Sequence, residues 1–204
     1  MQGKRIGIDA TTLEANAAMR SIVRRDTGES YNEFLTGLAK ASGMETPTRE
    51  DLARLDRKLE KRTSNKEWKS PIDEDARVAK MKDGSTHLAH KAEHAVDMDS
   101  GAVVAVTLQA ADLGDTTTVH QTLAAAGLAV AELVVREVEL HPVDHPKVNV
   151  DGLEELVADK GYHSGAVLEQ VKDLEVRTYI RTRANETGTA SRLSSRRSSP
   201  TRTE

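Results

Sequence analysis

The feature that most constrains the fold of this chain is a succession of segments with the two-residue period of a strand and segments with helical periodicity. A strand pattern comes first. A long polar insertion, a hairpin pattern, a helix, a strand, a second helix and a last strand follow it. Strands that alternate with helices in this way are typical of a sheet with helices packed on its faces. The sequence therefore predicts one α/β domain for residues 1–180.

Two of the predicted strands end in an aspartate. In residues 4–11 (KRIGIDAT) alternate isoleucines share one face, and the strand ends at Asp9. Residues 156–159 (LVAD) form a compact apolar run that is too short for a helix, ends at Asp159 and is followed by Lys-Gly. Neighbouring strands of one sheet would bring these distant carboxylates together.

The remaining elements are predicted from turns and caps. Residues 86–96 and 102–109 flank the turn residues 97–101 and predict a β-hairpin. Ser30 caps a predicted helix that ends near Gly43. Further predicted elements are helices that begin near Thr48, Asp115 and Ser164, a strand at 176–180, and a segment at 128–140 that fits a helix or a strand equally well.

Residues 12–85 form a predicted insertion of helices and loops after the first strand. The helix that begins near Thr48 carries a narrow leucine stripe among charged residues, so we expect it to be mostly solvated. Beyond the domain, residues 181–204 contain one aliphatic side chain larger than alanine, Leu193, among Arg, Ser and Thr. Such a segment cannot bury enough apolar surface to offset its chain entropy, so we expect it to be disordered.

Composition limits the classes of protein that fit. The chain has no cysteine, which excludes disulfides, thiolate catalysis and cysteine-based zinc sites. No window approaches the roughly 20 apolar residues that span a bilayer, and the N-terminus lacks the apolar part of a signal peptide, so we expect a cytoplasmic protein without membrane contact. A net charge of −4 argues against the whole chain being an electrostatic clamp on DNA.

Asp9 and Asp159 are the candidate catalytic residues and metal ligands. Two carboxylates that meet in one sheet repel each other unless a cation neutralises them, and hard oxygen donors suit Mg²⁺ or Mn²⁺. Such ions activate a water or a 3′-hydroxyl and stabilise the leaving oxygen during attack on a phosphodiester. On spacing alone, an aspartate that closes a strand is more often a turn or cap residue.

Four blocks of the sequence resemble one known family. In chain order they are GIDATTLEANAA (7–18), SNKEWKSPIDEDARVAKMKDG (64–84), LAHKAEHAVDMDSGAVVAV (88–106) and VADKGYHS (157–164). Their order and spacing resemble those of insertion-sequence DDE transposases over about Lys4 to Ile180. The most specific pieces are the Asp-Lys-Gly-Tyr turn and the Pro-Ile-Asp-Glu-Asp-Ala-Arg stretch.

The resemblance implies a ribonuclease-H-like mixed sheet with flanking helices, and metal-dependent cleavage and strand transfer on the DNA of insertion-sequence ends. Asp9 and Asp159 match the family's first and second catalytic aspartates. No residue here matches its third carboxylate, a Glu on a downstream helix, and Glu186 lies in a polar run without a helical pattern. We therefore expect a truncated or frameshifted copy that is catalytically incomplete.

Lys160 and Tyr162, which follow Asp159, each have two interpretations. Both could contact a DNA phosphate. However, a lysine in a turn is usually just solvated, and a tyrosine there could simply pack.

The histidines and the basic residues of the insertion have simpler interpretations. A zinc site at 87, 90 and 94 is disfavoured because a strand places His87 on the opposite face from His90 and His94. His141 and His145 we interpret as solvated. A basic run is diluted by acidic neighbours and is better explained as a solvated face; its members are Lys58, Lys61, Arg62, Lys66 and Lys69.

Two other interpretations of the whole chain stay open at this point. One is a non-catalytic remnant that binds DNA or associates with transposase subunits. The other is an α/β domain in which the two aspartates are coincidental.

Overall fold

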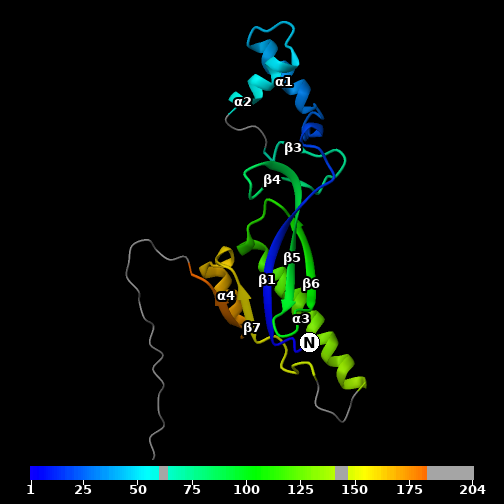
Figure 1. The fold of residues 1–204 in the computed structure, drawn as a ribbon, viewed down its shortest axis with the longest axis vertical. Helices are drawn as coiled ribbons and strands as arrows, with labels where there is room; N and C mark the ends of the chain where they lie inside the picture. Colours follow the sequence, from blue (N-terminus) through cyan, green and yellow to red (C-terminus); the bar gives the residue numbers. More distant parts are fainter. Residues whose placement is uncertain (60–63, 141–146, 183–204) are drawn as a thin grey trace, which may run out of the picture.

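The computed structural model describes residues 1–59, 64–140 and 147–182 (Figure 1). Its strands are β1 (Arg5–Glu14), β2 (Val23–Arg24), β3 (Trp68–Lys69), β4 (Arg77–Lys80), β5 (Thr86–Asp97), β6 (Val103–Ala110), β7 (Glu155–Ala158) and β8 (Arg177–Ile180). Its helices are α1 (Tyr31–Ala41), α2 (Arg49–Lys58), α3 (Asp115–Leu140) and α4 (Gly165–Asp173), with short 3-10 turns η1 (Met19–Ser21) and η2 (Lys160–Tyr162).

The main sheet is mixed, which confirms the predicted α/β class. β1 runs antiparallel to β5, from Ile6 opposite Asp97 to Glu14 opposite Ala89. On its other edge β1 pairs in parallel with β7, and β7 pairs in parallel with β8. β4 and β6 pair with successive parts of β5, so the order is β4-β5-β1-β7-β8 with β6 also beside β5.

The main core lies between one face of this sheet and the helices α3 and α4 (Figure 1). Ile6, Ile8 and Leu156 point into it from the strands, and Val119 and Leu123 meet them from α3. Because strand side chains alternate between faces, the odd-numbered positions of β1, Asp9 among them, point away from the helices. The predicted alternation of β1 therefore decides which side chains are left for the opposite face.

The segment at 128–140, which fitted a helix or a strand equally well in the sequence, is the second half of helix α3 and is helical throughout. Its first half buries Val119, Leu123, Ala126 and Val130 at spacings of three and four residues. Toward Leu140 the helix continues beyond the sheet, and its later apolar side chains are largely exposed (Figure 1). The core thus covers only part of the helix.

The insertion contributes a second lobe above the sheet (Figure 1). Capping boxes begin both of its helices, with Glu33 closing the box of Ser30 and Asp51 that of Thr48. Helix α2 buries no residue, as its sparse leucine stripe predicted. A second apolar cluster holds this lobe together; its buried members are Ile22, Trp68, Ala76 and Leu88, with Tyr31 and Phe34 packed against them.

Two predicted boundaries were wrong. We expected the first strand to end at Asp9 and the insertion to span 12–85, but β1 continues to Glu14 and β4, near the end of that range, belongs to the main sheet. The reason is that β5 is long enough to supply backbone partners to β1 as far as Ala89.

Several predictions fall outside the described residues. They are the predictions for residues 183–204 of the tail, Glu186 among them, and those for Lys61, Arg62, His141 and His145. Within the described ranges, no helix is both long enough and apolar enough to cross a membrane.

Candidate functional site

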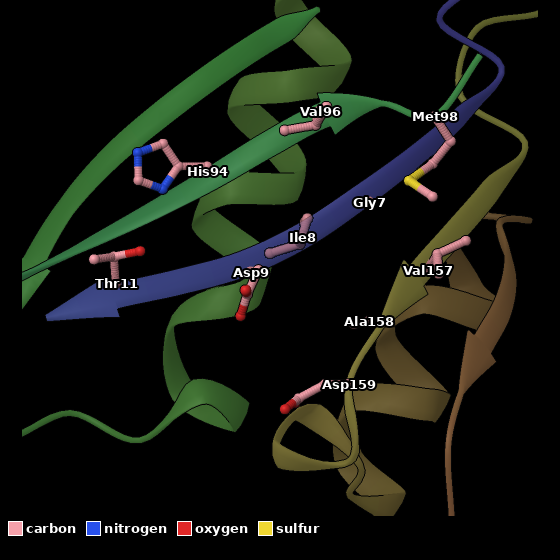
Figure 2. A pocket seen from close by; sticks show the side chains of 10 residues that line it. All are labelled: Gly7, Ile8, Asp9, Thr11, His94, Val96, Met98, Val157, Ala158 and Asp159. Atoms are coloured by element: carbon pink, nitrogen blue, oxygen red, sulfur yellow. The ribbon is translucent and has the colours of Figure 1, made fainter. Parts of the chain in front are cut away.

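The strand register brings Asp9 and Asp159 together. β1 and β7 pair in parallel as far as Ile8 opposite Ala158. Asp9 is the residue after Ile8, and Asp159 is the residue after Ala158. Both carboxylates line one pocket of about 480 Å³ between these strands (Figure 2). The predicted convergence is confirmed, although the catalytic role of the pair stays a prediction.

Asp9 lies within β1 rather than at its end. Parallel pairing with β7 stops one residue earlier, so the strand is open to solvent on that side from Asp9 onward. The carboxylate Oδ1 accepts a hydrogen bond from the backbone N–H of Ala10 at 2.8 Å. This local bond holds the side chain beside the pocket.

Asp159 is both a cap residue and a pocket residue. It precedes η2, and its Oδ1 accepts a hydrogen bond from the backbone N–H of Gly161 at 2.6 Å. A Cβ atom on Gly161 would lie 2.9 Å from this oxygen and 2.7 Å from Oδ2 of Asp115. Only glycine fits there without displacement, because the carboxylates of Asp115 and Asp159 both lie close to this position.

His94 lines the pocket, although the sequence pointed to it only as a member of a disfavoured zinc cluster. It lies on β5 directly opposite Asp9, and residues paired in this way point to the same face of a sheet. The imidazole therefore lies on the β5 side of the pocket, away from β7 and Asp159 (Figure 2).

The three histidines of β5 do not form a cluster. His87 pairs with Glu14 and His90 with Asp73, and each ring nitrogen contacts a carboxylate oxygen, at 2.5 and 2.8 Å. Across the part of the chain that the structure describes, no set of three or more histidine or acidic side chains is arranged to hold a metal ion.

Apart from Thr11, the rest of the pocket is apolar. Val96, Met98 and Val157 line it, and the Met98 sulfur lies over Gly7, where a Cβ would be only 2.5 Å away. The same face of the sheet continues onto β6 with Leu108, which is 64% exposed. Neither α3 nor α4 covers this face (Figure 2). The carboxylates thus border an open apolar surface.

Tyr162 does not lie where a DNA phosphate could reach it. The side chain is 1% exposed and packs in the main core, and its hydroxyl donates to Oε1 of Glu93 at 3.1 Å. Burial, followed by the charges of Glu93 and Asp115, holds the pKa of Tyr162 far above its usual value. The predicted phosphate contact of Tyr162 was wrong because the turn directs the ring inward, whereas Lys160 is exposed and its contact stays a prediction.

The sequence analysis also missed a buried polar group under the pocket. It consists of Lys91 and Glu93 from β5 with Asp115 and Thr118 from α3. A signal was present, since strand alternation places residues 91 and 93 on the same inward face as the buried Ala89 and Ala95. Two charges facing the core need partners, and α3 provides them.

Comparison of the sequence with protein-family models and with curated proteins found no match. A functional conclusion therefore depends on this geometry and on the four blocks that resemble transposases.

The basic residues of the insertion add little to the pocket. Lys58 and Lys66 are exposed, and Lys69 forms an ion pair with Glu74 at 2.6 Å. This arrangement agrees with a solvated face.

Proposed function

We propose that this chain is the catalytic domain of a DDE-type insertion-sequence transposase with a ribonuclease-H-like fold. Its substrate is DNA at the ends of the element, and its cofactor is Mg²⁺ or Mn²⁺ held by Asp9 and Asp159. The observation that carries the proposal is the register that sets these two residues side by side after Ile8 and Ala158. Two coincidental aspartates would have no reason to share one pocket.

The two side chains fit a divalent cation chemically. Mg²⁺ is commonly bound through one or two carboxylates, with water and substrate phosphate oxygens completing the shell. Among the hydrogen bonds of the described residues, Asp9 and Asp159 each use only Oδ1, so each keeps a second oxygen for a ligand. The open side of the pocket leaves room for a phosphodiester.

In the proposed phosphodiester cleavage, the cation and the protein residues have different roles. A divalent cation supplies charge stabilisation and activation of the attacking oxygen in phosphodiester cleavage. Asp9 and Asp159 would hold this cation, and the hydrogen bond from the Gly161 N–H fixes the orientation of Asp159. Met98 and Val157 form an apolar part of the pocket wall.

We further propose that these residues are catalytically incomplete by themselves. No third metal-ligating side chain accompanies Asp9 and Asp159 in the described ranges. With one carboxylate missing from three, cation binding weakens and the charge of the transition state is poorly compensated.

Calorimetric titration with Mn²⁺ tests the metal site, and a gel assay of plasmid nicking tests completeness. We expect the wild-type chain to bind Mn²⁺ weakly and Asp9→Asn or Asp159→Asn to abolish binding. Asp173→Asn is the matched control, since it removes an equal charge from an exposed position at the end of α4. Nicking should stay at background in every variant.

Two results would overturn these statements separately. Mn²⁺ binding that is absent, or unchanged when both Asp9 and Asp159 are replaced, contradicts the metal site. Robust nicking that depends on Asp9 contradicts the proposed incompleteness.

A further inference from the structure

A buried carboxylate lies behind Asp159, on the core side of the sheet. Glu93 on β5 is 0% exposed and accepts hydrogen bonds from three hydroxyls, those of Thr118 at 2.8 Å, Tyr162 at 3.1 Å and Thr122. A charge without water requires such partners, because isolated burial costs several kcal/mol or more. The hydroxyls come from α3 and η2, so Glu93 joins three elements.

Lys91 supplies the compensating charge. Its ammonium lies 2.6 Å from Oδ1 of Asp115 and 3.6 Å from Oε1 of Glu93, and it donates to the hydroxyl of Thr118 at 2.9 Å. Lys91 itself is only 5% exposed. One ammonium thus bridges two carboxylates between β5 and the first turn of α3.

This network reaches the pocket through the turn that follows β7. Tyr162 is the last residue of η2, and Asp159 is the residue that caps η2. Two hydrogen bonds hold this turn. The Tyr162 hydroxyl donates to Glu93 at its end, and the Gly161 N–H donates to Asp159 at its start. The carboxylate of Asp115, which pairs with Lys91, lies beside Gly161, where a Cβ atom would be 2.7 Å from its Oδ2.

We propose that Glu93 is a positioning residue for Asp159 and acts through the hydroxyl of Tyr162. The inference deepens the proposed function, on which its metal readout depends, but the geometry of the turn does not depend on a metal. An apolar core at this position would stabilise the fold at least as well as buried charges do. What the hydrogen-bonded carboxylate adds is a fixed direction for the turn, and so for the Asp159 side chain.

The test compares two substitutions that each remove one hydroxyl from the same carboxylate. Tyr162→Phe removes the donor on the Asp159 turn, whereas Thr122→Val removes a donor on α3; both side chains are almost fully buried. The readouts are amide proton exchange of Gly161 by NMR, Mn²⁺ affinity by calorimetry, and unfolding by urea.

We expect Tyr162→Phe to speed exchange of the Gly161 amide by about tenfold, because the turn opens locally. The Mn²⁺ dissociation constant should also rise about tenfold, as for the loss of other residues that orient a metal ligand. Thr122→Val should leave both quantities within about twofold of the wild type at a similar loss of global stability. Equal effects of the two substitutions would reduce Glu93 to a purely structural role and overturn the proposal.

A second variant keeps the proposal testable if Tyr162→Phe does not fold. Glu93→Gln retains an amide oxygen that can accept from Tyr162, so Gly161 exchange should stay within about threefold of the wild type. A rise of about tenfold in Glu93→Gln would contradict the proposal, because the acceptor is still present. Absence of Mn²⁺ binding in the wild type would instead overturn the proposed function, and the exchange data would still decide the role of Glu93.

Discussion

Replacement of Lys91 by methionine tests whether the buried ammonium compensates the carboxylates around it. Methionine keeps most of the length and the apolar stem of lysine but removes the charge. Lys91 is 5% exposed and contacts both Asp115 and Glu93. The substitution therefore leaves two carboxylates without their shared cation while it opens little space in the core.

The magnitude follows from the burial of the two carboxylates. Glu93 is 0% exposed, and the loss of one member of a buried ion pair costs about 3–5 kcal/mol. Asp115, whose side chain is 38% exposed, adds little because water screens it. Since a whole domain is stable by about 5–15 kcal/mol, Lys91→Met should remove a large part of the free energy of unfolding.

Urea unfolding followed by far-ultraviolet circular dichroism measures this loss. In the double variant Lys91→Met with Glu93→Gln, the uncompensated charge is gone, so we expect it to regain about 1–3 kcal/mol over Lys91→Met alone. A loss below about 1 kcal/mol in Lys91→Met, or no recovery in the double variant, would refute the reasoning. If Lys91→Met is unfolded, the expected result is that only the double variant folds.

Two further substitutions test the turn and the hairpin. Gly161→Ala should lower the free energy of unfolding by about 1–3 kcal/mol and weaken Mn²⁺ binding, because its Cβ meets Asp115 and Asp159 below 3 Å. Gly165→Ala is the control, since nothing lies within 4 Å of its Cβ; equal losses in urea titrations would contradict the steric argument. The pKa of Asp97 is raised by burial but lowered by more through hydrogen bonds from Ser100 and Gly3, so its net direction is downward. The contribution of the Asp97 carboxylate to the free energy of unfolding is therefore fully present above the unfolded pKa of about 3.9. It is lost as the pH falls through the pKa of the folded state. Asp97→Asn should be less stable than the wild type near neutral pH, and this difference in the free energy of unfolding should shrink as the pH falls. A difference that grows in acid would contradict the downward direction of the Asp97 pKa.

The parts of the fold that depend on local chemistry could be predicted from the sequence. The cap at Ser30, the helix starts near Thr48 and Ser164, and the hairpin around residues 97–101 each depend on neighbours within a few positions, and each is confirmed. The convergence of Asp9 and Asp159 was predictable for a similar reason. Each comes directly after a short apolar run in the sequence, and the parallel pairing of β1 with β7 aligns these two positions.

The missed features depend on contacts between distant segments. The length of β1 past Asp9 depends on how far β5 extends, and periodicity within β1 does not contain that information. The inward direction of Tyr162 depends on Glu93, a partner far away in the chain. His94 joins the pocket only through the β1–β5 register. In each case the deciding partner is supplied by another strand or helix.

The two apolar clusters have a consequence for any spectroscopic study of this protein. The single tryptophan, Trp68, lies in the cluster of the insertion lobe, with Tyr31 at 5.2 Å between ring centroids, and not in the core behind the aspartates. Its emission therefore monitors the insertion lobe and the start of β5, where Leu88 joins this cluster. If the two lobes melt separately, a fluorescence transition reports on the insertion and is silent about the core beneath the pocket.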